Sequence, residues 1–282
     1  MSPQQVADAF RAACMAELAA LKPGNVHIFA DGHNMVVQQF IQSADAVAAV
    51  IAEPRLTVGA RILASINATW QVVDCNTNLG IVLLCAPLVE AALVDDSSSL
   101  QSRLAQVLQS LTIADADLAF QAIVRASPAG LGKSDQHDVH DSPKISLLAA
   151  MRESAERDRI AWQYIHEFSD IFDFGLPHYA AAIARWNNPA WATSVLYLAW
   201  LSEFPDSHIS RKYDLALAQE VQQEAQHHLQ RMLAQDNPKS YQRDLMQFDT
   251  QLKSRRINPG TSADLTVATL MAYALQKADS PA

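Results

Sequence analysis

Apolar residues recur every three or four positions along nearly all of this 282-residue chain, which is the periodicity of an α-helix. No segment shows the sustained alternation of polar and apolar residues that marks a half-buried strand. The sequence therefore predicts an all-α fold. The expected helices cover residues 3–21, 35–52, 57–73, 79–94, 99–110, 113–126, 144–172, 178–187, 189–203, 214–235, 238–255 and 262–277.

Capping patterns support several of these helix starts. Ser2 with Gln5, and Thr112 with Asp115, have the spacing of capping boxes, and Pro3 suits a first helical turn. No Ser/Gly-rich linker, low-complexity tract or internal repeat divides the chain. We therefore expect residues 1–282 to form a single globular multi-helix domain.

Composition excludes some classes of function. Lys and Arg number 21 against 30 Asp and Glu, so the formal net charge is −9, and no dense basic run suggests nucleic-acid binding. Half of the residues are hydrophobic, which is enough for a large core. The three cysteines, Cys14, Cys75 and Cys85, are scattered, which fits a reducing compartment and argues against a thiolate zinc site.

The sequence also gives expectations about location. The N-terminus has no basic segment followed by an apolar run, as a secretory signal would. The longest apolar stretch, residues 79–93, is interrupted by Pro87 and Glu90 and is shorter than the roughly 20 residues that span a bilayer. We expect a cytoplasmic protein that does not contact membranes.

Glycine is scarce and its placement is informative. The chain has only 8 glycines, under half of what an average usage of about 7% would give. Six of them lie in short loops that also carry unusual polar residues, and a glycine serves where a backbone turns sharply or approaches a ligand. These glycines are Gly24, Gly32, Gly80, Gly130, Gly132 and Gly260.

Five loops, at residues 21–34, 74–80, 129–141, 204–213 and 258–264, are therefore candidate binding segments. The first turns at Pro23-Gly24, which brings Lys22, His27, Asp31 and His33 close enough to line one pocket. The second precedes a very apolar helix, whose exposed amides would attract an anion. Ordinary turns, helix caps and solvated surface loops are the alternative explanation for each.

Charged residues in two of these loops suit phosphate and metal. Arg211 and Lys212 are adjacent and follow His208, which fits a phosphorylated substrate that Arg binds with two hydrogen bonds. Asp135, Asp138 and Asp141 alternate with His137 and His140, so this segment could hold Mg²⁺ through carboxylates or a softer ion through imidazoles, although it lacks strict ligand spacing.

Three carboxylates fall on apolar helical rows. Glu17 lies between Cys14 and Leu21, Asp158 lies within the predicted helix 144–172, and Asp264 begins the last helix. Buried carboxylates need cations, hydrogen-bond donors or a shifted pKa. Structural ion pairs are one explanation. Convergence of the three acids on a central polar cavity is the other, and we favour it.

The loop motifs, in this order, resemble the triphosphoribosyl-dephospho-CoA synthase family. The Glu17 position also agrees with a Glu that precedes the family's Lys-Pro-Gly. The matching segments are Lys22-Pro23-Gly24-Asn25-Val26, Asp31-Gly32-His33-Asn34-Met35, Asn76-Thr77-Asn78-Leu79-Gly80, Asp206-Ser207-His208-Ile209-Ser210-Arg211 and Asn258-Pro259-Gly260-Thr261-Ser262-Ala263-Asp264-Leu265.

The resemblance implies an all-helical, ATP-dependent glycosyl transferase. Such enzymes join the triphosphoribosyl part of ATP to a hydroxyl of 3′-dephospho-CoA and release adenine, which makes a prosthetic-group precursor for citrate and malonate decarboxylation. The chain departs from the family where it reads Asn78-Leu79 in place of the usual His-Lys, and again within residues 130–141.

Together with the chemistry of the residues, the resemblance predicts a Mg²⁺-dependent transferase and suggests roles for individual residues. Glu17 or Asp158 would act as general base, and His33 or His208 would protonate the leaving group. The expected phosphate- and substrate-binding residues are Lys22, Asn25, Asn76, Thr77, Asn78, Gly80, Arg211, Lys212, Asn258 and Gly260. The expected metal ligands are Asp135, Asp138 and Asp264.

The expected partners are a nucleotide-like donor, ATP or phosphoribosyl pyrophosphate, and a small cofactor-precursor acceptor. Three alternatives stay open at this point. They are phosphoribosyl transfer in the biosynthesis of a tetrahydromethanopterin-type cofactor, nucleotide binding without catalysis, and metal-dependent hydrolysis of a ribosylated or phosphorylated compound. The sequence makes no prediction of oligomeric state.

Overall fold

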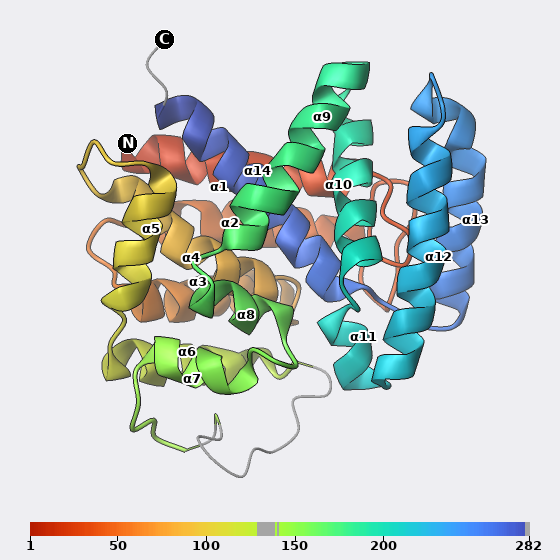
Figure 1. Cartoon of the computed structure of the whole chain (residues 1–282). Helices are drawn as coiled ribbons and strands as arrows, with labels where there is room; N and C mark the ends of the chain where they lie inside the picture. The colour runs from red at the N-terminus through yellow and green to blue at the C-terminus, as the bar shows by residue number, and fades with distance from the viewer. Residues whose placement is uncertain (129–138, 140, 280–282) are drawn as a thin grey trace.

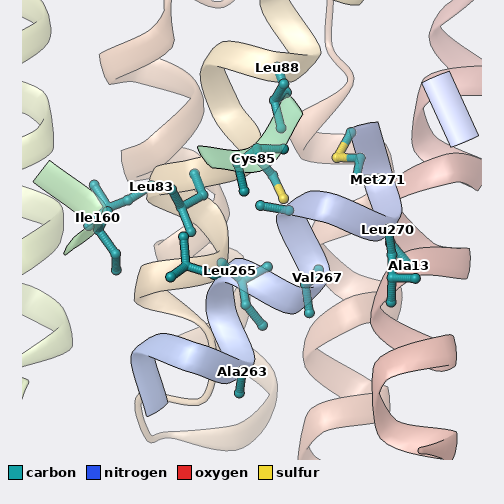
Figure 2. Close-up of a cluster of buried hydrophobic side chains, with 14 of the residues drawn as sticks. Ala13, Leu83, Cys85, Leu88, Ile160, Ala263, Leu265, Val267, Leu270 and Met271 are labelled. Carbon is teal, nitrogen blue, oxygen red and sulfur yellow. The ribbon is translucent and has the colours of Figure 1, made fainter. Parts of the chain in front are cut away.

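Three helices that are buried on nearly every side lie at the centre of the computed structural model, which describes residues 1–128, 139 and 141–279. They are α4 (Leu79–Leu93), α10 (Pro189–Glu203) and α14 (Gly260–Asp279), and α14 packs against both of the others. Helices that are apolar all round must be buried in this way. Figure 2 shows the core where Leu83 and Cys85 of α4 lie near Leu265 and Met271 of α14.

The remaining helices cover this core, and the described residues contain no strand, so the all-α prediction is confirmed. A short π-helix (Asp170–Gly175) leads into α9, and a 3₁₀ turn (Pro238–Tyr241) leads into α13. The covering helices are α1 (Pro3–Ala19), α2 (Val37–Ile51), α3 (Val58–Val73), α5 (Leu100–Gln109), α6 (Ile113–Ala126), α7 (Leu147–Ser154), α8 (Arg159–Ile165), α9 (Leu176–Trp186), α11 (Ser207–Lys212), α12 (Leu215–Leu233) and α13 (Gln242–Ser254).

The helices form one compact helical domain with two flanks around α14 (Figure 1). On one flank α12 packs against α10, and the rings of His228 on α12 and Phe248 on α13 are stacked. On the other flank α3 packs against α2 and α6, and α7 packs against α6 and α8. Residues 20–36 connect α1 to α2, and Gly24 within them contacts α13 through the side chain of Leu252.

The predicted caps are present. The Ser2 hydroxyl accepts a hydrogen bond from the Gln5 N–H, and the Gln5 side chain accepts one from the Ser2 N–H. Thr112 and Asp115 form the same reciprocal pair at the start of α6. These short-range patterns could be predicted because both partners lie within one helical turn.

The predicted helix 144–172 is wrong as a single element. α7 ends at Ser154, and α8 begins after Asp158, whose carboxylate accepts hydrogen bonds from the N–H groups of Ile160 and Ala161. Glu167 and Phe168 then adopt left-handed conformations, with φ of 52° and 59°, which end the helical path. The row of apolar residues on which Asp158 was expected to lie therefore does not exist, and Asp158 is a helix cap.

The segment 204–213 also differs from its prediction as a loop. Residues 207–212 form α11, and the Asp206 carboxylate caps it by accepting hydrogen bonds from the N–H groups of His208 and Ile209. The Asp-Ser pair is a typical helix start, but a helix of six residues has too little periodicity to be recognised.

The apolar helix α4 has 15 residues. Within the described ranges no single helix is long and apolar enough to span a membrane. α5 and α6, which meet at 96°, pass the same length and composition test only as a bent pair.

Gly59 offers a test of the packing between α3 and α6. A Cβ atom at this position would lie 2.5 Å from the Cα and carbonyl oxygen of Asp115, which belong to the backbone of α6. Gly→Ala inside a helix normally stabilises by up to about 1 kcal/mol. We expect Gly59→Ala to lower the free energy of unfolding instead, by about 1–3 kcal/mol, because the backbones must separate.

Urea denaturation measures this difference. Gln71→Ala, on the exposed face of the same helix, is the control and should change stability by less than about 0.5 kcal/mol. A stabilised Gly59→Ala variant would show that α3 and α6 are not in close contact.

Candidate functional site

A pocket of about 500 Å³ brings together residues from α1, α8 and all five predicted loops, the third loop through Val139. These segments lie far apart in the sequence, and the other four loops contribute side chains that the sequence analysis singled out. The predicted residues that line the pocket are Glu17, Asn25, His33, Asn76, Thr77, Asn78, Gly80, Asp158, His208, Arg211, Lys212, Asn258, Gly260 and Asp264.

Among the predicted catalytic, binding and metal residues that the structure describes, Lys22 alone does not line the pocket, so its predicted placement is wrong. Its side chain is fully buried and does not line the pocket. The ammonium group is paired with Glu17 and donates to the side-chain oxygen of Asn25 at 3.2 Å and the carbonyl of Val26 at 2.6 Å. Burial raises the pKa of Glu17, which the Lys22 charge opposes. Lys22 therefore contacts a pocket carboxylate and does not itself line the pocket.

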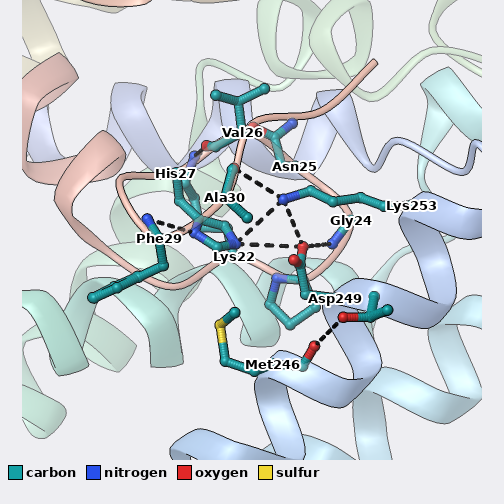
Figure 3. Close-up of polar contacts among 12 residues, drawn as sticks. Lys22, Gly24, Asn25, Val26, His27, Phe29, Ala30, Met246, Asp249 and Lys253 are labelled. Atoms are coloured by element: carbon teal, nitrogen blue, oxygen red, sulfur yellow. Dashed lines mark hydrogen bonds and ion pairs between the residues drawn. The ribbon is translucent and has the colours of Figure 1, made fainter. Parts of the chain in front are cut away.

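His27 and Asp31 also lie away from the pocket. The buried His27 ring places Nε2 3.3 Å from a carboxylate oxygen of Asp249 on α13 (Figure 3). Asp31 accepts a hydrogen bond from the Val37 N–H at the start of α2. Of the four residues expected to line a pocket from this loop, only His33 does so.

Buried and half-buried partners that the sequence analysis missed hold residues 22–30 in place. Asp249 accepts a hydrogen bond from the Gly24 N–H at 2.8 Å, and Lys253 donates to the Ala30 carbonyl at 3.1 Å. The Tyr197 hydroxyl of α10 donates to the Pro23 carbonyl at 2.6 Å. Asp249 and Lys253 have the i, i+4 spacing of a solvated surface pair, so no sequence signal separated them from ordinary exposed charges.

The first and last loops contact each other directly. The Asn25 amide donates to the Asn258 side-chain oxygen at 2.8 Å, and both residues line the pocket. Gly24 has φ of +83°, and a Cβ atom there would lie 2.8 Å from Cδ of Pro259. Only glycine fits this crossing, which explains the Pro-Gly turn.

Polar residues before α4 support its first turn. The Asn76 side chain accepts a hydrogen bond from the Leu79 N–H at 3.1 Å, while Asn78 and Thr69 hydrogen-bond through their side chains at 2.9 Å. The Thr77 hydroxyl lies 2.7 Å from the Ser43 hydroxyl of α2. These contacts fix the loop shape, and the substrate-binding role of the three residues stays a prediction.

Asp206 joins α11 to α14. One carboxylate oxygen caps α11, and the other accepts hydrogen bonds from the N–H and the hydroxyl of Ser262, both at 2.8 Å. The His208 N–H lies 3.1 Å from the Thr261 hydroxyl as well. Asp206 thereby places the histidine and the cations of α11 beside the first turn of α14.

The positive and imidazole groups that line the pocket are His33, His208, Arg211 and Lys212. Arg211 donates to the Asp158 carboxylate at 3.0 Å, which links α11 to α8. Burial, reinforced by the charges of Arg211 and Lys212, lowers the pKa of His208 to about 4. Burial also lowers the pKa of His33. Both imidazoles are therefore neutral at pH 7 in the unliganded protein.

Carboxylates face the same space. Burial first, and then the nearby Asp206, Glu17 and Asp158, raise the pKa of Asp264 well above its usual value, whereas Arg211 opposes the rise. A Cβ atom at Gly80 would overlap the Asp264 carboxyl oxygen. Glycine at the start of α4 therefore lets the α14 carboxylate approach closely.

Other residues that line the pocket are apolar. They are Leu83 of α4, Ile123 of α6, Met151 of α7 and Ile160 of α8. The sequence analysis missed these residues as site residues because apolar positions at helical spacing look like ordinary core. The pocket lining thus combines charged and apolar residues.

A metal site is not evident within the described part of the chain. Asp135 and Asp138 lie outside the described residues. Asp264 is described, but no group of three or more His, Cys, Asp or Glu side chains within the described ranges could hold a metal ion.

A sequence model of the CitG family, described as ATP:dephospho-CoA triphosphoribosyl transferase, matches residues 3–281. The chain belongs to this family. It is therefore a transferase, and the family's activity indicates triphosphoribosyl transfer from ATP to dephospho-CoA. The resemblance deduced from the loop motifs is confirmed.

One solved structure has a fold similar to that of this CitG-family protein. A crystal structure of a candidate triphosphoribosyl-dephospho-CoA synthase from Archaeoglobus fulgidus superposes with a TM-score of 0.63 and 20% sequence identity. The match covers 84% of this chain and 98% of the archaeal chain. At this identity the likeness establishes the fold alone. No curated protein matches the sequence.

Gly80→Ala tests the approach of Asp264 to α4. The added Cβ displaces the end of a side chain and no backbone, so we expect the fold to persist with Asp264 out of place. Misplacement of a site group by about 1 Å can reduce turnover about 10²-fold. Gly260→Ala is the matched control, since its Cβ would lie 3.1 Å from the His208 ring. It should lose less transferase activity, and equal losses would contradict the argument.

The pKa of His208 predicts a pH-dependent stability. The unfolded His208 takes up a proton below about pH 6.5, whereas the folded one does so only near pH 4, so acid favours unfolding in this interval. His208→Gln removes this penalty. We expect the variant to gain about 2 kcal/mol relative to wild type between pH 8 and pH 5, measured by denaturant unfolding. Exposed His227→Gln is the control, and parallel pH profiles of His208→Gln and wild type would contradict the shift.

Proposed function

We propose that this transferase moves the triphosphoribosyl group of ATP to a hydroxyl of 3′-dephospho-CoA, releases adenine and requires Mg²⁺. The observation that carries the proposal is the single pocket in which cations and imidazoles, carboxylates and apolar residues face the same space. ATP has the matching order of parts, because its ribose lies between a charged triphosphate and a flat base.

The triphosphate fits beside His208, Arg211 and Lys212. Arg211 offers a planar donor pair for phosphate oxygens, and Lys212 offers a compact charge. Negative charge beside the two imidazoles would raise their pKa and let them take up protons. ATP binding would thereby charge both imidazoles, and His33, which is not assigned to the triphosphate, would protonate the leaving base.

The ribose carbon would then lie near Glu17 and Asp264. Breaking the bond between C1 and the adenine nitrogen leaves the electron pair on adenine and positive charge on the ribose, which carboxylates stabilise. The acceptor hydroxyl forms the new C1–O bond and gives its proton to Glu17. Lys22 keeps that carboxylate in place.

The adenine ring fits against the apolar residues Ile123, Met151 and Ile160. Base and triphosphate extend from opposite ends of the ribose. A triphosphate held by the cations would therefore direct the base toward these apolar residues. Flat apolar surfaces bind a base by stacking and burial without requiring charge.

Mg²⁺ fits this arrangement as a ligand of the triphosphate. The ion is commonly held by one or two carboxylates together with substrate phosphates, so a cluster of three protein ligands is not required. Asp264 and Asp158 face the pocket and have the oxygen chemistry the ion prefers. Asp135 and Asp138 are the further candidates. Bound Mg²⁺ would neutralise part of the phosphate charge.

Adenine release tests the proposal. Purified protein with ATP, dephospho-CoA and Mg²⁺ should release one adenine per product, seen by chromatography, and the product mass should equal dephospho-CoA plus triphosphoribose minus water. A chelator should abolish the release. Pyrophosphate release from phosphoribosyl pyrophosphate, with no adenine from ATP, would contradict the proposal and support the phosphoribosyl alternative, which the family match does not favour.

Two variants examine the assigned roles in that assay. Glu17→Gln should reduce kcat at least tenfold, because a general base contributes about 10²–10⁴-fold. Lys212→Met changes an exposed side chain, so it should fold normally and raise KM for ATP more than KM for dephospho-CoA. Asp8→Asn, exposed on α1, is the control for Glu17. Unchanged kinetics in both variants would remove these residues from the site.

A further inference from the structure

The backbone of Gly24 connects a buried carboxylate to a pocket histidine. Its N–H donates to Asp249 at 2.8 Å, and its carbonyl oxygen lies 2.7 Å from Nε2 of His33. A carbonyl can only accept a hydrogen bond, so Nε2 of His33 must carry the proton. In the neutral ring Nδ1 is then the unprotonated nitrogen.

Asp249 is firmly held although it does not line the pocket. Its carboxylate is buried and lies 3.0 Å from Nζ of Lys253 and 3.3 Å from Nε2 of His27 (Figure 3). Burial acts to raise the pKa of Asp249, but hydrogen bonds and charge from His27 and Lys253 outweigh it and keep the pKa below its usual value. The group that receives the Gly24 N–H is therefore a carboxylate.

Gly24 has little freedom to move between its two partners. With φ of +83°, its Cα lies so close to Pro259 and Leu252 that a Cβ atom would come within 2.8 Å and 2.9 Å of them. The side chains of α13 and the last loop thus enclose the turn. A shift of Asp249 would therefore move the Gly24 backbone and, with it, His33.

We propose that Asp249 is a positioning residue for the transferase. It holds the Gly24 backbone, and the Gly24 carbonyl in turn fixes the ring plane of His33 and its Nε2–H tautomer. Nδ1 is then the atom at which His33 takes up a proton and gives it to the leaving base. The catalytic part of this inference rests on the proposed function, whereas the tautomer and its dependence on Asp249 do not.

Nuclear magnetic resonance of the full chain with ¹⁵N-labelled histidine tests the inference without substrate. At pH 7.5 the wild-type His33 signals should show the Nε2–H tautomer. Asp249→Ala should shift them toward a mixture of tautomers. Asp249→Asn keeps an oxygen that can accept the Gly24 N–H, so it should restore most of the wild-type signal. Asp244→Asn, exposed on the same helix, is the control.

Kinetics then connect the tautomer to turnover. Asp249→Ala should lower kcat at least tenfold with less than a threefold change in KM for dephospho-CoA, and Asp249→Asn should recover most of kcat. A wild-type Nδ1–H tautomer, or unchanged His33 signals in Asp249→Ala, would overturn the inference, and so would unchanged kcat. Should Asp249→Ala not fold, a wild-type Nδ1–H tautomer would still overturn the inference. A wild-type protein with the expected tautomer but no adenine release would refute the proposed function alone.

Discussion

The carboxylate of Asp206 is the contact on which the candidate site depends most. One oxygen caps α11, and the other binds the Ser262 backbone and hydroxyl in the first turn of α14. A buried carboxylate between two helix starts is stabilised by their N–H groups and by their dipoles. α14 is fixed in the core, so this shared carboxylate holds Arg211 and Lys212 in the same pocket as Glu17 and Asp264. The charged lining of the pocket follows from that placement.

The pocket is held together by contacts between segments that lie far apart in the sequence. Asn25 binds Asn258, Arg211 binds Asp158, and Asp249 binds the Gly24 backbone. Each bond joins segments from different parts of the chain, so the helical core fixes the distances between them. A rigid frame of this kind suits a reaction in which the triphosphate, the ribose carbon and the acceptor hydroxyl must be held in line.

Local patterns and the family motifs predicted much of the fold and the pocket, whereas buried long-range partners could not be predicted. Capping boxes at Ser2 and Thr112 are local, so the sequence revealed them. The break at Asp158 was missed because apolar spacing continues through it. Lys22 was misplaced because its partner Glu17, five residues earlier, is buried beside it. Asp249 was missed because its partners are Gly24 and His27, more than 200 residues away.

The central claim is that the charged residues of one pocket bind the triphosphate of ATP while its apolar residues bind the adenine. A crystal structure of the Glu17→Gln variant with ATP and Mg²⁺ tests it most directly. The account predicts triphosphate oxygens within hydrogen-bonding distance of His208, Arg211 and Lys212, with the adenine ring against Ile123 and Met151. ATP bound in the reverse orientation, with adenine beside Arg211, or bound outside this pocket, would contradict it.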